Sequence, residues 1–221
     1  MKSGVLLTLR VIIKSFFFNL KLFSLRTAFH FPILLYPNFK IKGIKSKSNK
    51  IIIKDNTKRI VFGGAPSLGL PSVSSGGIIL GENAKLILNG GIYISQGTSL
   101  RIEEGASIEI GKNTYINGNC YLRSNNKITI GNDCLIGWNV LINTTDGHHL
   151  FIDGKESLCS RSIVIGNHCW IGNNSCISKG TTMADNCILA QYSLLNKDFD
   201  PNHLLGGIPA KIIKNNVTWK K

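Results

Sequence analysis

Aliphatic residues recur every six positions through the second half of the chain. The longest series without a gap runs from residue 165 to residue 195, and shorter series occupy residues 80–92, 110–128 and 130–142. This period matches neither the 3.6-residue repeat of an amphipathic helix nor the simple alternation of one half-buried strand. A fixed short repeat is typical of a β-solenoid, in which each coil stacks on the next. The long series consists of Ile165, Ile171, Ile177, Met183, Leu189 and Leu195.

Two further positions of the hexad carry a consistent residue type. The residue after the aliphatic one is often Gly, and the fifth residue is small or compact. Three hexads would form one triangular coil, with the aliphatic and the fifth residue pointing into its narrow interior. Gly, Asn and Asp tolerate the backbone angles that the corners require. The pattern predicts an all-β fold, a parallel β-helix that begins near residue 78. Its fifth-position residues are Ala84, Thr114, Cys120, Cys134, Val140, Cys169, Ser175 and Cys187.

The cysteines fit this repeat better than they fit a metal or disulfide site. Four of the six occupy the fifth position, where a free cysteine serves as a small apolar core residue. No C-x-x-C pair is present, which argues against zinc binding and thioredoxin-like chemistry. We therefore expect free cysteines, no metal and a reducing, cytoplasmic compartment.

The first 50 residues lie outside the repeat and form a basic, apolar segment. Residues 5–25 are rich in Leu, Ile and Phe, and on a helix Arg10, Lys14 and Lys21 would fall along one face. Two interpretations stay open: a helix at the membrane surface, or a helix packed against the rest of the protein or a neighbouring subunit. A spanning helix is not expected, because the longest uncharged run has 13 residues and a bilayer requires about 20.

The same segment is strongly basic. The formal net charge is +14, and residues 1–50 contain ten of the 26 Lys and Arg residues but no Asp or Glu. Such a segment is typical of proteins that bind phosphate groups of lipid, nucleic acid or an anionic substrate. No aromatic stacking platform accompanies the basic residues, so we expect no nucleic-acid partner. Arg10 and Lys14 interrupt the apolar run that a signal peptide requires. We expect a cytoplasmic protein, peripheral on the inner face of the membrane if residues 5–25 bind lipid.

The repeat breaks after Ile142. Residues 147–162 do not fit the hexads, which resume at Ile163 or Ile165. A solenoid that interrupts itself extrudes a loop, and loops on a rigid scaffold often carry function. The sequence DGHH stands where this loop leaves the solenoid. We therefore divide the chain into residues 1–50 and a β-helix domain of residues 51–221, with an extruded loop at 147–162 and a short C-terminal tail.

Three blocks, in order, resemble the hexapeptide-repeat acyltransferase family over roughly residues 78–215. They are IGNDCLIGWNVLINTTDGHHLF, IVIGNHCWIGNNSCISKGTTMADNCIL and NKDFDPNHLLGGIPAKIIK, the last containing the family's closing G-x-P-A-K segment. The resemblance implies a left-handed parallel β-helix, a homotrimer, and transfer of an acetyl group from acetyl-CoA to a sugar. The acceptor that it suggests is a hydroxyl of a surface polysaccharide, a lipopolysaccharide precursor or a nucleotide sugar.

The resemblance also places the catalytic residues at the start of the loop. It implies that His148 is the general base, which removes the acceptor's proton while the acceptor oxygen attacks the thioester directly. In an extended strand Asp146 would share a face with His148 and would orient either His148 or the acceptor. Asp146 could equally be a corner residue. His149 would point the opposite way and is the weaker candidate for the base.

Acetyl-CoA is expected to lie in the groove between neighbouring subunits, beside the later coils. Lysines suit its phosphates, because an ammonium group acts as a point charge toward them. By resemblance, the positions along the path of the donor are Trp170, Ile171, Gly172, Asn173 and the corner formed by Lys179 and Gly180, with Lys197 and Lys211 as candidates for the phosphates.

Four residues depart from the family pattern, and other functions stay open. Gln191 and Tyr192 are bulky where small residues are usual, Ala184 replaces the commoner Gly, and Asn173 replaces the commoner Ala. A zinc enzyme of the γ-carbonic-anhydrase type would require converging histidines, and the five histidines here lack a short His-x₄-His pair. The remaining alternatives are a non-catalytic solenoid that binds or scaffolds, and an N-acetyltransferase that acts on an amino sugar.

Overall fold

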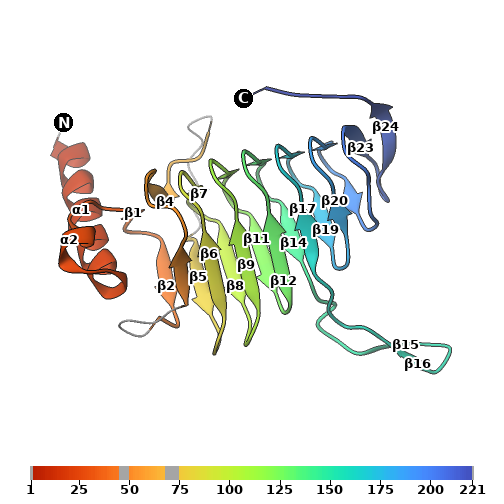
Figure 1. The fold of residues 1–221 in the computed structure, drawn as a ribbon, viewed down its shortest axis with the longest axis horizontal. Coiled ribbons are helices and arrows are strands. Elements are labelled where there is room, and N and C mark those ends of the chain that lie inside the picture. The colour runs from red at the N-terminus through yellow and green to blue at the C-terminus, as the bar shows by residue number, and fades with distance from the viewer. Residues whose placement is uncertain (1, 45–49, 68–74, 221) are drawn as a thin grey trace.

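The computed structural model describes residues 2–44, 50–67 and 75–220, which form a solenoid with helices at its N-terminal end (Figure 1). Helix α1 spans Lys2–Leu22 and helix α2 spans Leu25–Ala28, so the helix expected over residues 5–25 is present as two pieces. Lys45 and Lys47, which belong to the basic segment, lie outside the described residues.

Three sheets form the sides of the solenoid. Along each coil the chain passes through sheets A, B and C in turn, and each strand pairs in parallel with strands one coil away. Sheet A contains β1 (Ile33–Leu35), β4 (Ile60–Gly64), β7 (Tyr93–Ser95), β10 (Tyr115–Ile116), β13 (Leu135–Ile136), β18 (Trp170–Ile171), β21 (Ile188–Leu189), β23 (His203–Gly206) and the antiparallel β24 (Lys211–Asn215). Sheet B contains β2 (Lys40–Lys42), β5 (Gly77–Leu80), β8 (Ser99–Ile102), β11 (Tyr121–Ser124), β14 (Leu141–Asn143), β19 (Cys176–Ser178) and β22 (Leu194–Leu195). Sheet C contains β3 (Ile51–Ile53), β6 (Lys85–Leu88), β9 (Ser107–Ile110), β12 (Lys127–Ile130), β17 (Ile163–Ile165) and β20 (Thr182–Met183).

The interior follows the hexad pattern. Every aliphatic residue of the long series and every fifth-position residue is at most 1% exposed. At one corner Asp133, His168 and Asn186 adopt φ values of 58°, 53° and 60°, which place them in the left-handed region. At Gly131 a Cβ would lie 2.5 Å from the backbone of Gly166, so the coils stack too closely there for any side chain. The predicted fold class, an all-β left-handed parallel β-helix, is confirmed.

The first coil begins earlier than the hexads indicate. β1 and β2 lie within residues 1–50, and they place Ile33 beside Ile60 and Ile41 beside Ile78 in parallel register. The segments that join the first strands are longer than a hexad corner, which hides their common spacing. The basic N-terminal segment therefore supplies both the helices and the first strands of the solenoid.

Helix α1 covers the free edge of β1, the end strand of sheet A. Asn19 Nδ2 donates to the carbonyl of Ile33 at 2.7 Å, and the Ile33 amide donates to Asn19 Oδ1 at 3.2 Å. The Leu35 amide donates to Ser15 Oγ at 2.8 Å. Ser15 and Asn19 are fully buried, so α1 replaces a missing neighbouring strand with side-chain hydrogen bonds.

The segment 147–162 leaves the solenoid between sheets B and C, as expected. It contains an antiparallel hairpin of β15 (Leu150–Ile152) and β16 (Lys155–Ser157), which projects away from the coils (Figure 1). The coils keep their register across this insertion, since Ile142 pairs with Ile177 and Ile130 pairs with Ile165. The hairpin is thus an appendage on an otherwise continuous scaffold.

Candidate active site

His148 lies where the chain turns from sheet B into the hairpin. Its side chain is exposed and makes no hydrogen bond to any described residue. Gly147 has a φ of +79°, so residues 146–148 turn and do not continue a strand. The extended geometry expected for Asp146 and His148 is therefore wrong. His149 is held by Glu156 across the hairpin, which leaves His148 as the histidine of the pair that is open to a ligand.

Asp146 contacts Lys179 and not His148. Lys179 Nζ donates to the Asp146 carboxylate and to the carbonyl of Leu158, at 2.5 Å in the second case. Lys179 comes from the corner of the next coil, where Gly180 turns with a φ of +74°. Lys179 and Asp146 therefore fasten the base of the hairpin to the neighbouring coil within this chain.

A hollow of about 360 Å³ lies on sheet A and includes three of the residues expected along the donor's path. Gly172 is required there because a Cβ would lie 2.4 Å from the amide nitrogen of Gln191. Tyr192 occupies a corner with a φ of +56° and is 64% exposed, so its ring lies outside the hollow. Ile171 is fully buried in the core and does not line the hollow. The lining residues are Trp170, Gly172, Asn173, Ile188, Leu189, Ala190, Gln191 and Leu204.

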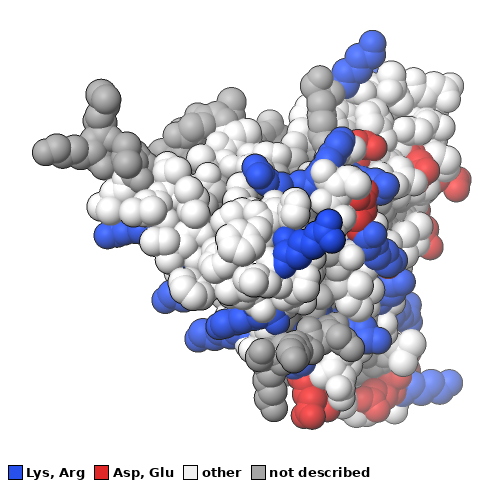
Figure 2. All heavy atoms as spheres, turned by 60° about the vertical axis from the view of Figure 1, so that its left-hand side comes forward, with Lys and Arg blue, Asp and Glu red and all other residues white. Residues whose placement is uncertain are grey.

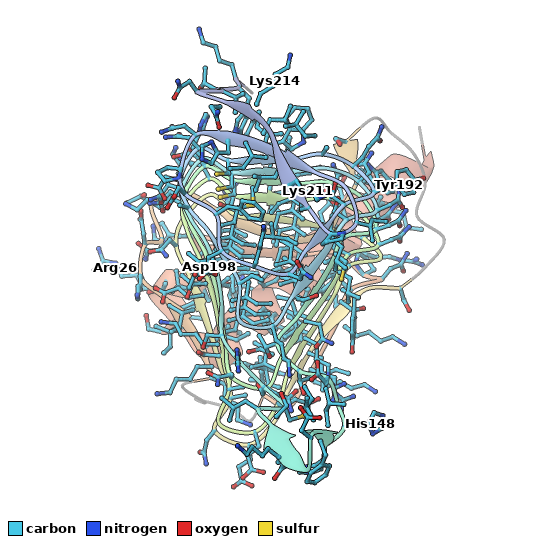
Figure 3. All side chains as sticks on the ribbon, turned by 90° about the vertical axis from the view of Figure 1, so that its right-hand side faces the viewer. Arg26, His148, Tyr192, Asp198, Lys211 and Lys214 are labelled. Carbon is cyan, nitrogen blue, oxygen red and sulfur yellow. The ribbon has the colours of Figure 1, made fainter. Side chains whose placement is uncertain are left out.

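Within one chain, the hollow on sheet A and His148 lie far apart. The hollow lies on sheet A, whereas His148 leaves the corner between sheets B and C, on the opposite side of the triangular coil. Figure 3, which looks along the solenoid, shows His148 well away from Lys211 and Tyr192. Lys211 begins the exposed strand β24, and Lys197 lies over the Phe199 ring with its Nζ 5.3 Å from the ring centre.

Arg123 is a neighbour of the site that the sequence did not single out. It lies in register with Asn143 of β14, and its guanidinium is 3.9 Å from the place of a Cβ on Gly147. Its Nε donates to Glu103 at 3.1 Å. In the sequence, Arg123 is an outward residue one coil before the loop. Its closeness to the loop can be inferred only when the register of the coils is known.

Trp219 is a second neighbour that sequence reasoning missed. Its ring stacks on His168 with centres 4.5 Å apart, lies 6.0 Å from the ring of Trp170, and donates Nε1–H to the His168 carbonyl at 2.8 Å. The C-terminal tail thereby closes back over the corner beside the hollow. A lone aromatic in a basic tail carries no sequence signal for this contact.

Four cysteines fill the interior of the coils. All six cysteines are reduced thiols, and Cys120, Cys134, Cys169 and Cys187 are buried. Burial raises the pKa of Cys120 to about 12 and also raises the pKa of Cys187. These thiols stay protonated near neutrality and are poor nucleophiles. Within residues 2–44, 50–67 and 75–220, no group of three His, Cys, Asp or Glu side chains is arranged to hold a metal ion.

The later coils are similar in sequence to known protein families and proteins. A family model described as Bacterial transferase hexapeptide (six repeats) matches residues 162–197, and one described as Hexapeptide repeat of succinyl-transferase matches residues 127–147. The chain is 36% identical to galactoside O-acetyltransferase of Escherichia coli K12 over 82 residues, which are 36% of this chain and 40% of the relative. It is 30% identical to polysialic acid O-acetyltransferase of Escherichia coli O1:K1 over 89 residues, 39% of this chain and 29% of the relative. The chain thus spans less than half the length of these two relatives.

Solved structures extend the likeness to most of the chain. The polysialic acid O-acetyltransferase OatWY superposes with a TM-score of 0.61 at 26% identity, over 86% of this chain and 90% of that one. The polySia-specific acetyltransferase NeuO superposes with a TM-score of 0.67 at 24% identity, over 86% of this chain and 79% of that one, and shares the fold. Repeat, architecture and relatives agree in their likeness to the hexapeptide-repeat transferases.

Proposed function

We propose that this protein transfers the acetyl group of acetyl-CoA to a hydroxyl of a sugar, with His148 as the general base. The observation that carries the proposal is the place of His148, exposed and without a hydrogen-bond partner in the described chain, beside a loop on a rigid solenoid. The relatives named galactoside and polysialic acid O-acetyltransferase support the reaction and the acceptor class. The acceptor is accordingly a sugar of a polysaccharide, a lipopolysaccharide precursor or a nucleotide sugar.

The proposed reaction needs one base and no covalent enzyme intermediate. The imidazole of His148 takes the proton of the acceptor hydroxyl as the acceptor oxygen attacks the thioester carbonyl. The C–S bond then breaks, and the acetyl group stays on the sugar as an ester. The CoA thiolate receives the proton from the imidazolium, which restores the base. Asp146 and Lys179 position the hairpin base beside His148.

The donor site requires a second subunit. Trp170, Gly172 and Asn173 line the hollow on sheet A, on the opposite side of the coil from His148. A homotrimer that sets the corner of one subunit against sheet A of the next would unite the two groups. Lys197 and Lys211, with Gly180 at the corner, would then serve the phosphates and chain of the donor. Light scattering should give three times the 24.2 kDa of one chain, and a fully active monomer would contradict this arrangement.

We also place the protein on the inner face of a membrane, held there by residues 5–25. In the described part of the chain, no helix is both long and apolar enough to cross a bilayer. The outward face of α1 is nevertheless apolar, as expected of a helix that lies in the interface.

The assignment of the base is tested by comparing two adjacent histidines. His148→Ala should lower acetyl transfer to a galactoside or a polysialic acid oligomer by about 10²–10⁴-fold, measured as release of free CoA. His149→Ala loses only its pairing with Glu156 and should keep most activity. An acetyl product that mild base removes is an ester, whereas a stable amide would favour the N-acetyltransferase. Wild-type activity in His148→Ala would refute its role as base.

The donor site is tested by calorimetry with acetyl-CoA, CoA and dephospho-CoA. Lys211→Ala should bind acetyl-CoA more weakly than wild type, and it should distinguish CoA from dephospho-CoA less well. Lys85→Ala, an exposed lysine on sheet C, serves as the matched control. Absence of saturable binding to the wild type would favour the non-catalytic solenoid.

A further inference from the structure

The outward face of α1 is apolar although it caps a solenoid. Ser15 and Asn19 hold one face of the helix against β1. The opposite face carries large apolar side chains at i, i+3, i+7 and i+11 that are about half exposed or more. The end cap of a repeat protein normally turns a polar face to solvent, because an apolar one would associate. These outward residues are Leu6 at 50%, Leu9 at 51%, Ile13 at 48% and Phe17 at 61%, with Leu25 at 59% and Phe29 at 62% added by the chain beyond α1.

Positive charge without acidic partners surrounds this apolar face. No Asp or Glu precedes Asp55, so residues 1–54 contain cationic but no anionic side chains. Figure 2 shows Lys and Arg side chains bordering a broad uncharged surface at this end of the molecule. In the described chain no carboxylate pairs with any of the five residues Arg10, Lys21, Arg26, Lys40 and Lys42.

A hollow of about 580 Å³ lies between α1 and β2, and both apolar and basic side chains line it. Lys14 is not available in it, because its Nζ donates to the carbonyls of Tyr36, Pro37 and Phe39 at 2.8–3.0 Å. Burial, with the charge of Lys40 second, also lowers the pKa of Lys14. The remaining lining consists of apolar Phe17, Phe18, Leu35, Phe39 and Ile41, and of the unpaired Lys21, Lys40 and Lys42.

We propose that the N-terminal end of the solenoid docks flat on an anionic phospholipid bilayer. α1 lies in the interface with Leu6, Leu9, Ile13 and Phe17 among the upper acyl carbons. Lipid phosphates occupy the hollow beside Lys21, Lys40 and Lys42. A second copy of the chain is a poorer occupant of the same face, because two such ends would bring together two rings of uncompensated cations.

This docking fixes the orientation of the molecule. α1 runs across the solenoid axis (Figure 1), so a bilayer parallel to α1 leaves the solenoid upright. β14, which precedes the hairpin, is four strands beyond β2 in the order β2-β5-β8-β11-β14. Four strand spacings place the start of the hairpin on the order of 20 Å beyond β2, and α1 adds about 10 Å between the first strands and the bilayer. If His148 is the base of the proposed function, the acceptor is a sugar some distance along a lipid-linked glycan and not the sugar next to the lipid.

The experiment is co-sedimentation of the full chain with vesicles of phosphatidylcholine alone or mixed with phosphatidylglycerol. Wild type should bind the mixed vesicles at least tenfold more tightly than the neutral ones. Ile13→Ser/Phe17→Ser should lose at least tenfold in binding, and Lys40→Gln/Lys42→Gln about fivefold for each lysine removed. Val164→Ser, at an exposed valine on sheet C, should bind like wild type. Equal binding to both kinds of vesicle, or variants that bind like wild type, would overturn the proposal.

Two controls keep the outcomes distinct. If Ile13→Ser/Phe17→Ser lowers the oligomer mass and leaves vesicle binding intact, the occupant is a second copy and the proposal fails. Acetyl-CoA binding, measured on the same variants, should stay at the wild-type level, so loss of membrane binding is separable from loss of transferase function. A dye on Cys159, at the base of the hairpin, should escape quenching by spin-labelled lipids that quench Phe17→Trp. Quenching of the Cys159 dye would overturn the upright orientation.

Discussion

The two ends of the solenoid solve the same problem in different ways. Both must deal with an unpaired strand, because an open sheet edge recruits further strands. At the N-terminal end α1 satisfies the edge of β1 with buried Ser15 and Asn19. At the C-terminal end β24 turns back on β23 and stays exposed, with Lys211 and Lys214 on the edge strand itself.

The two caps differ in the surface that they expose, which indicates different surroundings for the two ends of the solenoid. Lysines on an edge strand keep that edge in water and discourage pairing with another chain. The N-terminal cap already covers the edge of β1, yet it displays Leu, Ile and Phe side chains outward. Its apolar surface therefore serves contact with a partner, and not closure of the fold.

The largest effect should come from Phe62, in contrast to Phe17 at the same end of the molecule. Phe62 is fully buried and stacks on Phe39 with ring centres 5.6 Å apart, whereas Phe17 is 61% exposed. Phe62→Ala should lower the free energy of unfolding by about 3–5 kcal/mol. Phe17→Ala should change it by less than about 0.5 kcal/mol. Urea denaturation followed by circular dichroism measures both, and a comparable loss in Phe17→Ala would mean that its ring is buried in solution.

A smaller effect should follow from removing the polar contact that docks α1. Asn19→Ala leaves the amide and the carbonyl of Ile33 without their partner in a buried place. The free energy of unfolding should fall by about 1–3 kcal/mol. Asn38→Ala, at an exposed asparagine of the following turn, is the control and should behave like wild type. If Asn19→Ala is neutral, water reaches the edge of β1 and the cap is not closed.

The smallest effect is expected at the C-terminal end. Trp219→Ala removes the stacking on His168 and the hydrogen bond to its carbonyl. Because few contacts hold the tail, the loss should be local, below about 1 kcal/mol in global stability. Trypsin should then cleave at Lys220 and Lys214 faster than in wild type. Unchanged cleavage would show that the tail is held by contacts other than Trp219.

The coils could be predicted from the sequence because the hexad reports directly on the interior. Ile171 and Cys169 are identified by spacing alone, and both are buried as that spacing requires. The strands β1 to β4 were not predicted, because the longer connections between them hide the six-residue spacing. Around the site, the sequence located the extruded loop, but not the partner of Asp146. Lys179 is 33 residues away, and only the stacking of coils brings the two together.

The hairpin at 147–162 also bears on how such a protein changes over evolutionary time. It enters and leaves at one corner, while Ile142 with Ile177 and Ile130 with Ile165 keep their pairing on either side. Its length and composition can therefore vary without any adjustment of the core. The coils on either side of this corner therefore need no change when this single surface segment is replaced.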